Sequence, residues 1–290
     1  MYPAAFDYHA PKSIAEALAL LDQHQDDAKV LAGSQSLIPL LKLRLAYPKH
    51  LVDLRKLPGL VGVWESSGTL QIGAMTTHHG IATSALCHLE LPMLSEAAAQ
   101  IGDAQVRNMG TIGGSLAHAD PSADWPAVCS ALDATVILVS TKGERTMAIK
   151  DFLVGPLTSA LEPGEILTQV RVALLEGRSG AAYQKLPHPA SRFAIVGVAA
   201  VITLGADGKI SSARVAVTGL GSKASRVAAV EGALLGKAPD AAVFAAAAAW
   251  IADGIELRAD LTGSAAYHRQ LAQVTAGKAL ARAAARAAAE

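Results

Sequence analysis

Two stretches of small residues decide how this chain folds: Ala32-Gly33-Ser34-Gln35-Ser36 and Thr111-Ile112-Gly113-Gly114-Ser115. Each lies beside an apolar segment, and both fall within one domain's length of sequence. A backbone without bulky side chains can bring several N–H donors against one dense negative charge. The two stretches therefore predict the two halves of a clamp for the diphosphate of a nucleotide cofactor.

The first stretch is predicted to join a strand to a helix. Residues 29–32 form a short apolar run, and residues 37–45 have helical spacing with Pro39 near the first turn. Ser13 and Glu16 have the form of a capping box at the start of a helix over 13–24. Turn signals separate short strands expected at 51–54, 61–64 and 70–73. Strand, loop and helix in succession are a phosphate-binding arrangement.

The second stretch is predicted to be a loop between two helices. One helix is expected over 93–101 and another over 126–132, followed by a hairpin of 134–140 and 145–149 that turns at Gly143. Residues 1–176 are therefore expected to form one domain, with subdomains of about 1–55 and 56–176.

A smaller second domain is expected over 177–290, because Glu176-Gly177-Arg178-Ser179-Gly180 interrupts the apolar rhythm. It offers strands at 181–186, 195–204 and 210–217, then alanine-rich helices at 224–235, 241–251 and 265–286. Arg282 and Arg286 are expected on a solvated helix face. The fold class is α+β, with a small antiparallel sheet and helices in the second domain.

Composition excludes several classes of function. Lys+Arg and Asp+Glu are both 25, so no basic excess favours nucleic acid or an anionic membrane. The apolar runs at 195–204 and 241–251 are too short to span a bilayer, and the first residues lack the pattern of a signal peptide. A cytoplasmic protein is expected.

No metal site is predicted. The two cysteines, Cys87 and Cys129, are too few to hold zinc or an iron–sulfur cluster and are expected to be buried. His78 and His79 would point to opposite faces of a strand, and they and His118 have no carboxylate or thiol partner at ligand spacing.

Two longer runs carry a family signature: Leu31-Ala32-Gly33-Ser34-Gln35-Ser36-Leu37-Ile38-Pro39 and Gln105-Val106-Arg107-Asn108-Met109-Gly110-Thr111-Ile112-Gly113-Gly114-Ser115. With these runs, the chain resembles the FAD-binding medium subunit of the molybdenum hydroxylases, the group that contains carbon monoxide dehydrogenase and bacterial xanthine dehydrogenase. Shorter segments at 72–78, 117–124 and 183–186 are similar as well. Ser34 stands where the family usually has a second glycine, and Ser115 where it usually has Asn.

The resemblance implies a two-subdomain FAD-binding fold of the PCMH type, followed by a C-terminal domain like that of the carbon monoxide dehydrogenase flavoprotein. It also implies an apolar wall at Ile101, a carboxylate at the polar edge of the cofactor at Asp124, and a cation near the flavin ring at Lys185. The cofactor-binding residues that it implies are Ala32, Gly33, Ser34, Gln35, Ser36, Leu37, Ile101, Gly110, Thr111, Ile112, Gly113, Gly114, Ser115, Ala117, Asp120, Asp124, Leu167 and Lys185.

Taken alone, these residue types leave other interpretations open. The glycines could serve ordinary turns, Asp124 could cap a helix ahead of Pro126, and Lys185 could be a solvated strand lysine. Phe193 could line the flavin opening or pack in the core.

No catalytic residue is assigned, because the sequence shows no nucleophile–base pair or paired-acid motif. The resemblance implies that the FAD relays electrons from the [2Fe–2S] clusters of a small subunit to an external acceptor. A large subunit would hold the molybdenum cofactor, in a dimer of heterotrimers. The alternatives are a self-contained FAD-dependent reductase or oxidase, with Lys185, His188 and Arg192 near the ring, and a scaffold that has lost FAD.

Overall fold

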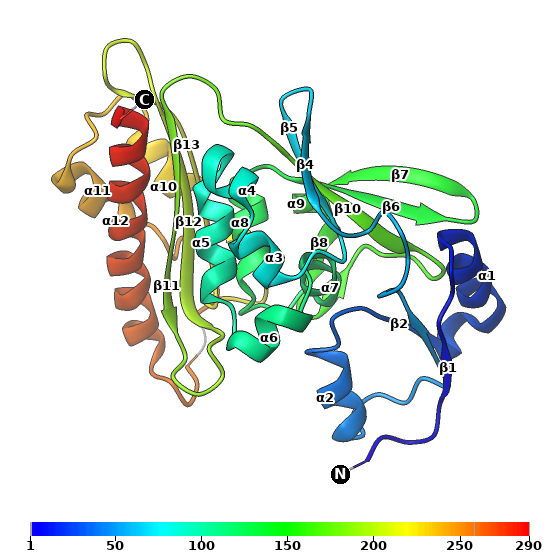
Figure 1. Ribbon diagram of the computed structural model, residues 1–290. Coiled ribbons are helices and arrows are strands. Elements are labelled where there is room, and N and C mark those ends of the chain that lie inside the picture. Colours follow the sequence, from blue (N-terminus) through cyan, green and yellow to red (C-terminus); the bar gives the residue numbers. More distant parts are fainter. Residues whose placement is uncertain (1, 258, 290) are drawn as a thin grey trace.

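The computed structural model describes residues 2–257 and 259–289, which form three groups of helices and strands (Figure 1). The first group is a parallel sheet in the order β1-β3-β2. Its strands are β1 (Asp7–His9), β2 (Ala28–Leu31) and β3 (His50–Asp53), and its helices are α1 (Ile14–His24), η1 (Gln25–Asp27) and α2 (Leu37–Lys42).

Local signals explain most of this group. The Ser13 hydroxyl accepts the Glu16 N–H at 3.1 Å and caps α1 as predicted, while the Glu16 carboxylate accepts the Lys12 N–H at 2.8 Å. The predicted strand, turn and helix around Gly33 are confirmed. The helix is shorter than expected, because Arg44 adopts a left-handed φ of 56° and ends it.

The second group contains an antiparallel sheet in the order β4-β5-β10-β6-β7. The central strand β10 was not predicted from the sequence. The strands are β4 (Val63–Ser66), β5 (Thr69–Gly73), β6 (Thr135–Ser140), β7 (Gly143–Ala148) and β10 (Ile166–Ala173), with a small pair, β8 (Leu153–Gly155) and β9 (Thr158–Ser159). The helices are α3 (His78–Ala82), α4 (Ala85–Glu90), α5 (Pro92–Gln100), α6 (Ala104–Met109), α7 (Ile112–His118), α8 (Asp124–Ala131) and α9 (Ile149–Phe152).

The third group is an antiparallel sheet in the order β11-β12-β13-β14, with three helices. Its three long strands were predicted, whereas the short β14 lies where the sequence suggested the start of a helix. The strands are β11 (Ser179–Pro187), β12 (Ala194–Leu204), β13 (Ile210–Thr218) and β14 (Ser225–Arg226), and the helices are α10 (Ala228–Leu234), α11 (Ala241–Ala248) and α12 (Ala265–Ala289).

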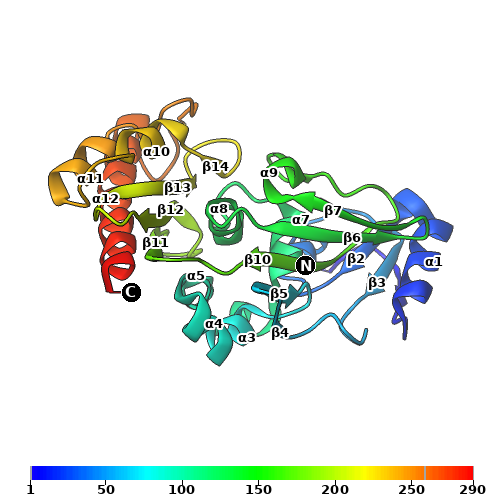
Figure 2. The ribbon, with the colours of Figure 1, turned by 90° about the horizontal axis from the view of Figure 1, so that it is seen from above.

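Both faces of the third sheet are buried. Figure 2 shows α12 on one side of β11 and β12, with α5 and α8 of the second group on the other. Side chains alternate accordingly along β12: Ala199 and Val201 join the core of the second group, and Ala200 and Ile202 join the core beneath α12. Close packing requires Gly180, because an added Cβ would overlap the carbonyl oxygen of Ala283 on α12.

The end of α12 also contacts the second group directly. The guanidinium of Arg286 pairs with Glu96 on α5 and donates to the carbonyl oxygen of Ala181 at 2.5 Å. The expectation of a solvated face is therefore wrong for Arg286, whose side chain is only 27% exposed. Within the described residues, no helix has the length and apolar character needed to cross a membrane.

Candidate cofactor site

The two stretches of small residues meet in space. We call residues 32–37 the first turn and residues 110–115 the second turn. A Cβ added to Gly33 would overlap the carbonyl oxygen of Met109 and would lie 2.6 Å from the Cα of Gly110. Only glycine permits this approach, so the two backbones are in direct contact at Gly33.

A cavity of about 680 Å³ lies along this contact, within the range of small-molecule and cofactor sites. It reaches from the first group across the second turn to the loop between β11 and β12, where Arg192 and Phe193 line it. The expected site residues that line it are Ala32, Gly33, Ser34, Gln35, Ser36, Leu37, Ile101, Gly110, Thr111, Gly114, Ser115, Ala117, Asp120 and Asp124.

Four expected site residues do not line this cavity. Ile112 and Leu167 are in the core, 0% and 6% exposed. A Cβ added to Gly113 would lie 2.5 Å from the Cβ of Ala74, so this glycine permits close packing beneath the second turn. Lys185 lies behind Asp124. Gly113 and Lys185 therefore support the cavity wall from behind.

The first turn leaves its backbone donors free. Among the described residues, the N–H groups of Gly33, Ser34, Gln35 and Ser36 have no hydrogen-bond acceptor in the chain. The carbonyl oxygens of Ala32 and Gly33 instead accept bonds from the side chains of Ser34, at 3.2 Å, and Gln35, at 3.1 Å. Ser36 occupies the N-cap of α2 without capping it, which leaves its hydroxyl available at the cavity. A run of free N–H groups at a helix start favours an anion.

The second turn is different, and the prediction of a loop there is corrected. Residues from Ile112 onward already belong to α7, and Thr111 is its N-cap, accepting the Gly114 N–H on its hydroxyl at 3.1 Å. Helical geometry forms here because the Thr111 hydroxyl satisfies an N–H at the helix start. The Ile112 N–H donates to Thr76 O at 3.1 Å, and the Gly113 N–H to Ala74 O at 2.9 Å. Most donors of the second turn are therefore used inside the protein.

A buried polar network closes one end of the cavity. Asp124, the first residue of α8, is 4% exposed and accepts from the Tyr183 hydroxyl at 2.6 Å and from Lys185 Nζ at 2.9 Å. The Lys185 side chain is fully buried and also donates to Gln100 O at 3.3 Å. Burial raises the pKa of Asp124 and lowers that of Lys185, and the contact between the two groups opposes both shifts. Lys185 is thus held by Asp124 and is not a solvated strand lysine.

Tyr183 was not predicted as a site residue. Burial, followed by the charge of Asp124, raises the pKa of Tyr183 well above 10, so its hydroxyl keeps its proton and donates. The signal was present in the sequence, since alternate residues of a strand share a face and Tyr183 precedes Lys185 by two positions.

His78 is a second residue that the sequence did not assign to the site, and it lies at the start of helix α3 and not, as expected, on a strand. Its Nδ1 accepts from Trp125 Nε1 at 3.0 Å, and a Cβ added to Gly110 would lie 2.7 Å from its Nε2. Burial, with a smaller contribution from Arg107, lowers the pKa of His78 to about 4. The neutral ring therefore carries its proton on Nε2, beside the second turn.

Comparison with known proteins defines the class to which this fold and site belong. Residues 4–174 match the model of the FAD binding domain in molybdopterin dehydrogenase, and residues 181–283 match that of the CO dehydrogenase flavoprotein C-terminal domain. A solved structure of carbon monoxide dehydrogenase from Hydrogenophaga pseudoflava, which lacks the Mo-pyranopterin moiety of the molybdenum cofactor, has a TM-score of 0.94 at 42% identity and covers 99% of both chains.

Relatives of different named activity match nearly the full length of this chain. The alpha subunit of the 6-hydroxypseudooxynicotine dehydrogenase complex of Paenarthrobacter nicotinovorans is 42% identical over 98% of this chain and 96% of its own. The carbon monoxide dehydrogenase medium chain of Hydrogenophaga pseudoflava is 42% identical and covers 94% of each. The chain belongs to the FAD-binding medium subunits of the molybdenum hydroxylases. It is the FAD subunit of an oxidoreductase of the dehydrogenase-complex type.

Proposed function

We propose that this chain holds FAD between the first and second turns and passes electrons from the [2Fe–2S] clusters of a small subunit to an external acceptor. The observation that carries the proposal is the run of free N–H groups from Gly33 to Ser36, at a cavity of about 680 Å³. Bound FAD supplies a group that accepts electrons singly and releases them as a pair.

The cavity residues divide into two roles in this proposal. The N–H groups of the first turn and the Ser36 hydroxyl bind the pyrophosphate, and the Thr111 N–H and the Ser115 hydroxyl contact it from the second turn. Asp124, held by Tyr183 and Lys185, accepts a hydrogen bond from the polar edge of the cofactor. Lys185 acts through Asp124 and is a positioning residue. Ile112 and Gly113 hold the second turn against the core.

The burial of both cysteines supports a relay that needs partner chains. Cys87 and Cys129 are each 0% exposed, and burial raises the pKa of Cys129 to about 12. A thiol that keeps its proton is a poor ligand for a metal or cluster. We therefore propose a dimer of heterotrimers in which the small subunit holds the clusters and the large subunit holds molybdenum and selects the substrate.

Domain limits and location are part of the same proposal. We place the FAD-binding domain at 1–176, with subdomains of about 1–55 and 56–176, and the C-terminal domain at 177–290. The separate sheets of the three groups support this division. Location in the cytoplasm is consistent with two free cysteines that form no disulfide.

The test uses the assembly purified from its native host, analysed for flavin, iron and molybdenum per chain. A Gly33→Val assembly is expected to lose FAD, to keep iron and molybdenum, and to accept electrons from substrate onto its clusters without delivering them to an external acceptor. Turnover of substrate by this chain purified alone would instead show a self-contained flavoenzyme.

A further inference from the structure

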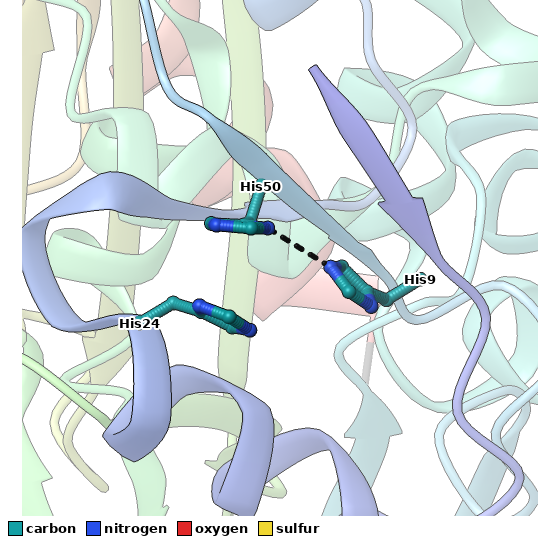
Figure 3. Close-up of side chains that lie close together, drawn as sticks. All are labelled: His9, His24 and His50. Carbon is teal, nitrogen blue, oxygen red and sulfur yellow. Dashed lines mark hydrogen bonds between the residues drawn. The ribbon is translucent and has the colours of Figure 1, made fainter.

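Three histidines from separate segments lie together in the first group. Figure 3 shows His9 on β1, His24 at the end of α1 and His50 at the start of β3, with their rings facing one another. One ring nitrogen of each lies within 4.8 Å of those of the other two, and all three residues are partly buried.

The fold produces this cluster from simple periodicity. In the parallel pairing of β1 with β3, Asp7 lies opposite His50, and His9 lies two residues further along β1. Residues paired across two strands lie on the same face of the sheet, and so do alternate residues of one strand. The side chains of Asp7, His9 and His50 therefore point to the same face. Helix α1 covers that face through Leu21, and His24 follows Leu21 by three positions on the same helix face.

The spacing matches that of metal ligands. His9 Nε2 lies 3.1 Å from His50 Nδ1. Two nitrogens about 2.0–2.1 Å from one tetrahedral zinc ion lie roughly 3.3 Å apart. The Asp7 carboxylate lies 3.6 Å from the same nitrogen of His50 and offers an oxygen ligand.

The third imidazole needs one rotation to join this pair. His24 stacks on His50, with ring centroids 3.6 Å apart and planes inclined by 23°. Because imidazole donates its lone pair in the plane of the ring, coordination requires His24 to turn about its side-chain bonds.

We propose that His9, His24 and His50, together with Asp7, form a binding site for a divalent transition metal, with zinc as the fitting ion. Three imidazole nitrogens and one carboxylate oxygen satisfy a tetrahedral zinc ion. The ion would join the edge strand β1, the start of β3 and the end of α1. Gln25 and Asp26, which follow His24, line the cofactor cavity. Bound zinc would therefore also restrict the motion of this part of the cavity wall.

The full chain, treated with a chelator and dialysed, is titrated with Zn²⁺ by calorimetry and with Co²⁺ by its visible absorption. One ion per chain is expected, with visible bands typical of tetrahedral Co²⁺. His9→Gln and His24→Gln should each weaken Zn²⁺ binding by about a hundredfold or more, because each removes a ligand.

His79→Gln is the matched control, since it removes one exposed imidazole on α3. It should bind Zn²⁺ as the unaltered chain does, and all three variants should bind FAD normally, which shows that they fold. Equal Zn²⁺ affinity in the unaltered chain and in His24→Gln would overturn the proposal, as would loss of the site in His79→Gln.

Discussion

The first and second turns are built from similar small residues and touch at Gly33, yet they use their backbones in opposite ways. The first turn leaves four successive N–H groups without acceptors inside the described chain, whereas the N–H groups of Ile112, Gly113 and Gly114 are all satisfied by Thr76, Ala74 and Thr111. The first turn is therefore arranged mainly to bind a ligand, whereas most donors of the second turn anchor it to the core. Glycine serves both purposes, because it permits backbone exposure in one place and close packing in the other.

The largest effect is expected from a substitution that disrupts the contact between the two turns at Gly33. In Gly33→Val, the new side chain would overlap Met109 O, and we expect FAD binding to weaken at least a thousandfold, about 4 kcal/mol. Titration of the flavin-free chain with FAD, followed by fluorescence, measures the FAD affinity. Gly232→Ala is the control, because an added Cβ there meets no atom within 4 Å. Normal FAD affinity in Gly33→Val would show that the contact between the turns is not needed.

The second prediction concerns pH and the anchor behind the second turn. The pKa of His78 is about 4 when folded and 6.5 in its ordinary state, so between these values the unfolded chain binds a proton that the folded chain does not. The contribution of His78 to stability is complete above pH 6.5 and is lost as pH falls toward 4, a change of about 3 kcal/mol. Denaturant unfolding of the unaltered chain and of His78→Gln between pH 4 and 6.5 measures this change in the free energy of unfolding. An equally steep decline in both proteins would contradict the assignment.

A third prediction separates anchoring from binding. Thr111→Val removes the cap of α7 and should lower the free energy of unfolding by about 1 kcal/mol, while FAD affinity changes much less. Thr111→Ser keeps the hydroxyl and should behave like the unaltered chain. Unfolding and FAD titration are measured on the same samples. If Thr111→Val weakened FAD binding without changing stability, the Thr111 hydroxyl would act on the cofactor and not on the helix cap, and the contrast would fail.

The smallest effect is expected at Ser34, where the family usually has glycine. Ser34 has a left-handed φ of 67°, so Ser34→Gly relieves backbone strain of about 1 kcal/mol and loses the bond to Ala32 O, worth about as much. Stability should change by a few tenths of a kcal/mol and FAD affinity by less than about twofold. A tenfold loss of affinity would mean that the Ser34 side chain itself contacts the cofactor.

Sequence reasoning succeeded where structure depends on neighbours along the chain. The capped helix after Ser13, the strand and helix around Gly33 and the long strands of the third group all follow from periodicity and turn signals. It missed β1, which is too short to show a pattern, and β10, whose apolar positions 166, 167, 170, 172 and 173 fit both a helix and a strand. It also placed a loop where Thr111 starts a helix.

At the candidate site, too, the sequence predicted some features and missed others. Most expected cavity residues were identified through a family signature, while Tyr183 and His78 were not. The sequence predicted no metal site, because His9, His24 and His50 are far apart in the chain and only the fold brings them together.

By itself, the sequence determined the family and the strand–turn–helix unit that starts the site, since these rest on local patterns, and its two cysteines are too few to hold an iron–sulfur cluster. Only the tertiary structure decided which backbone donors stay free, that Lys185 is held by Asp124, and that three histidines meet. The physical reason is that hydrogen-bond satisfaction and close packing depend on atoms brought together from distant segments, whereas helix and strand periodicity is set by adjacent residues.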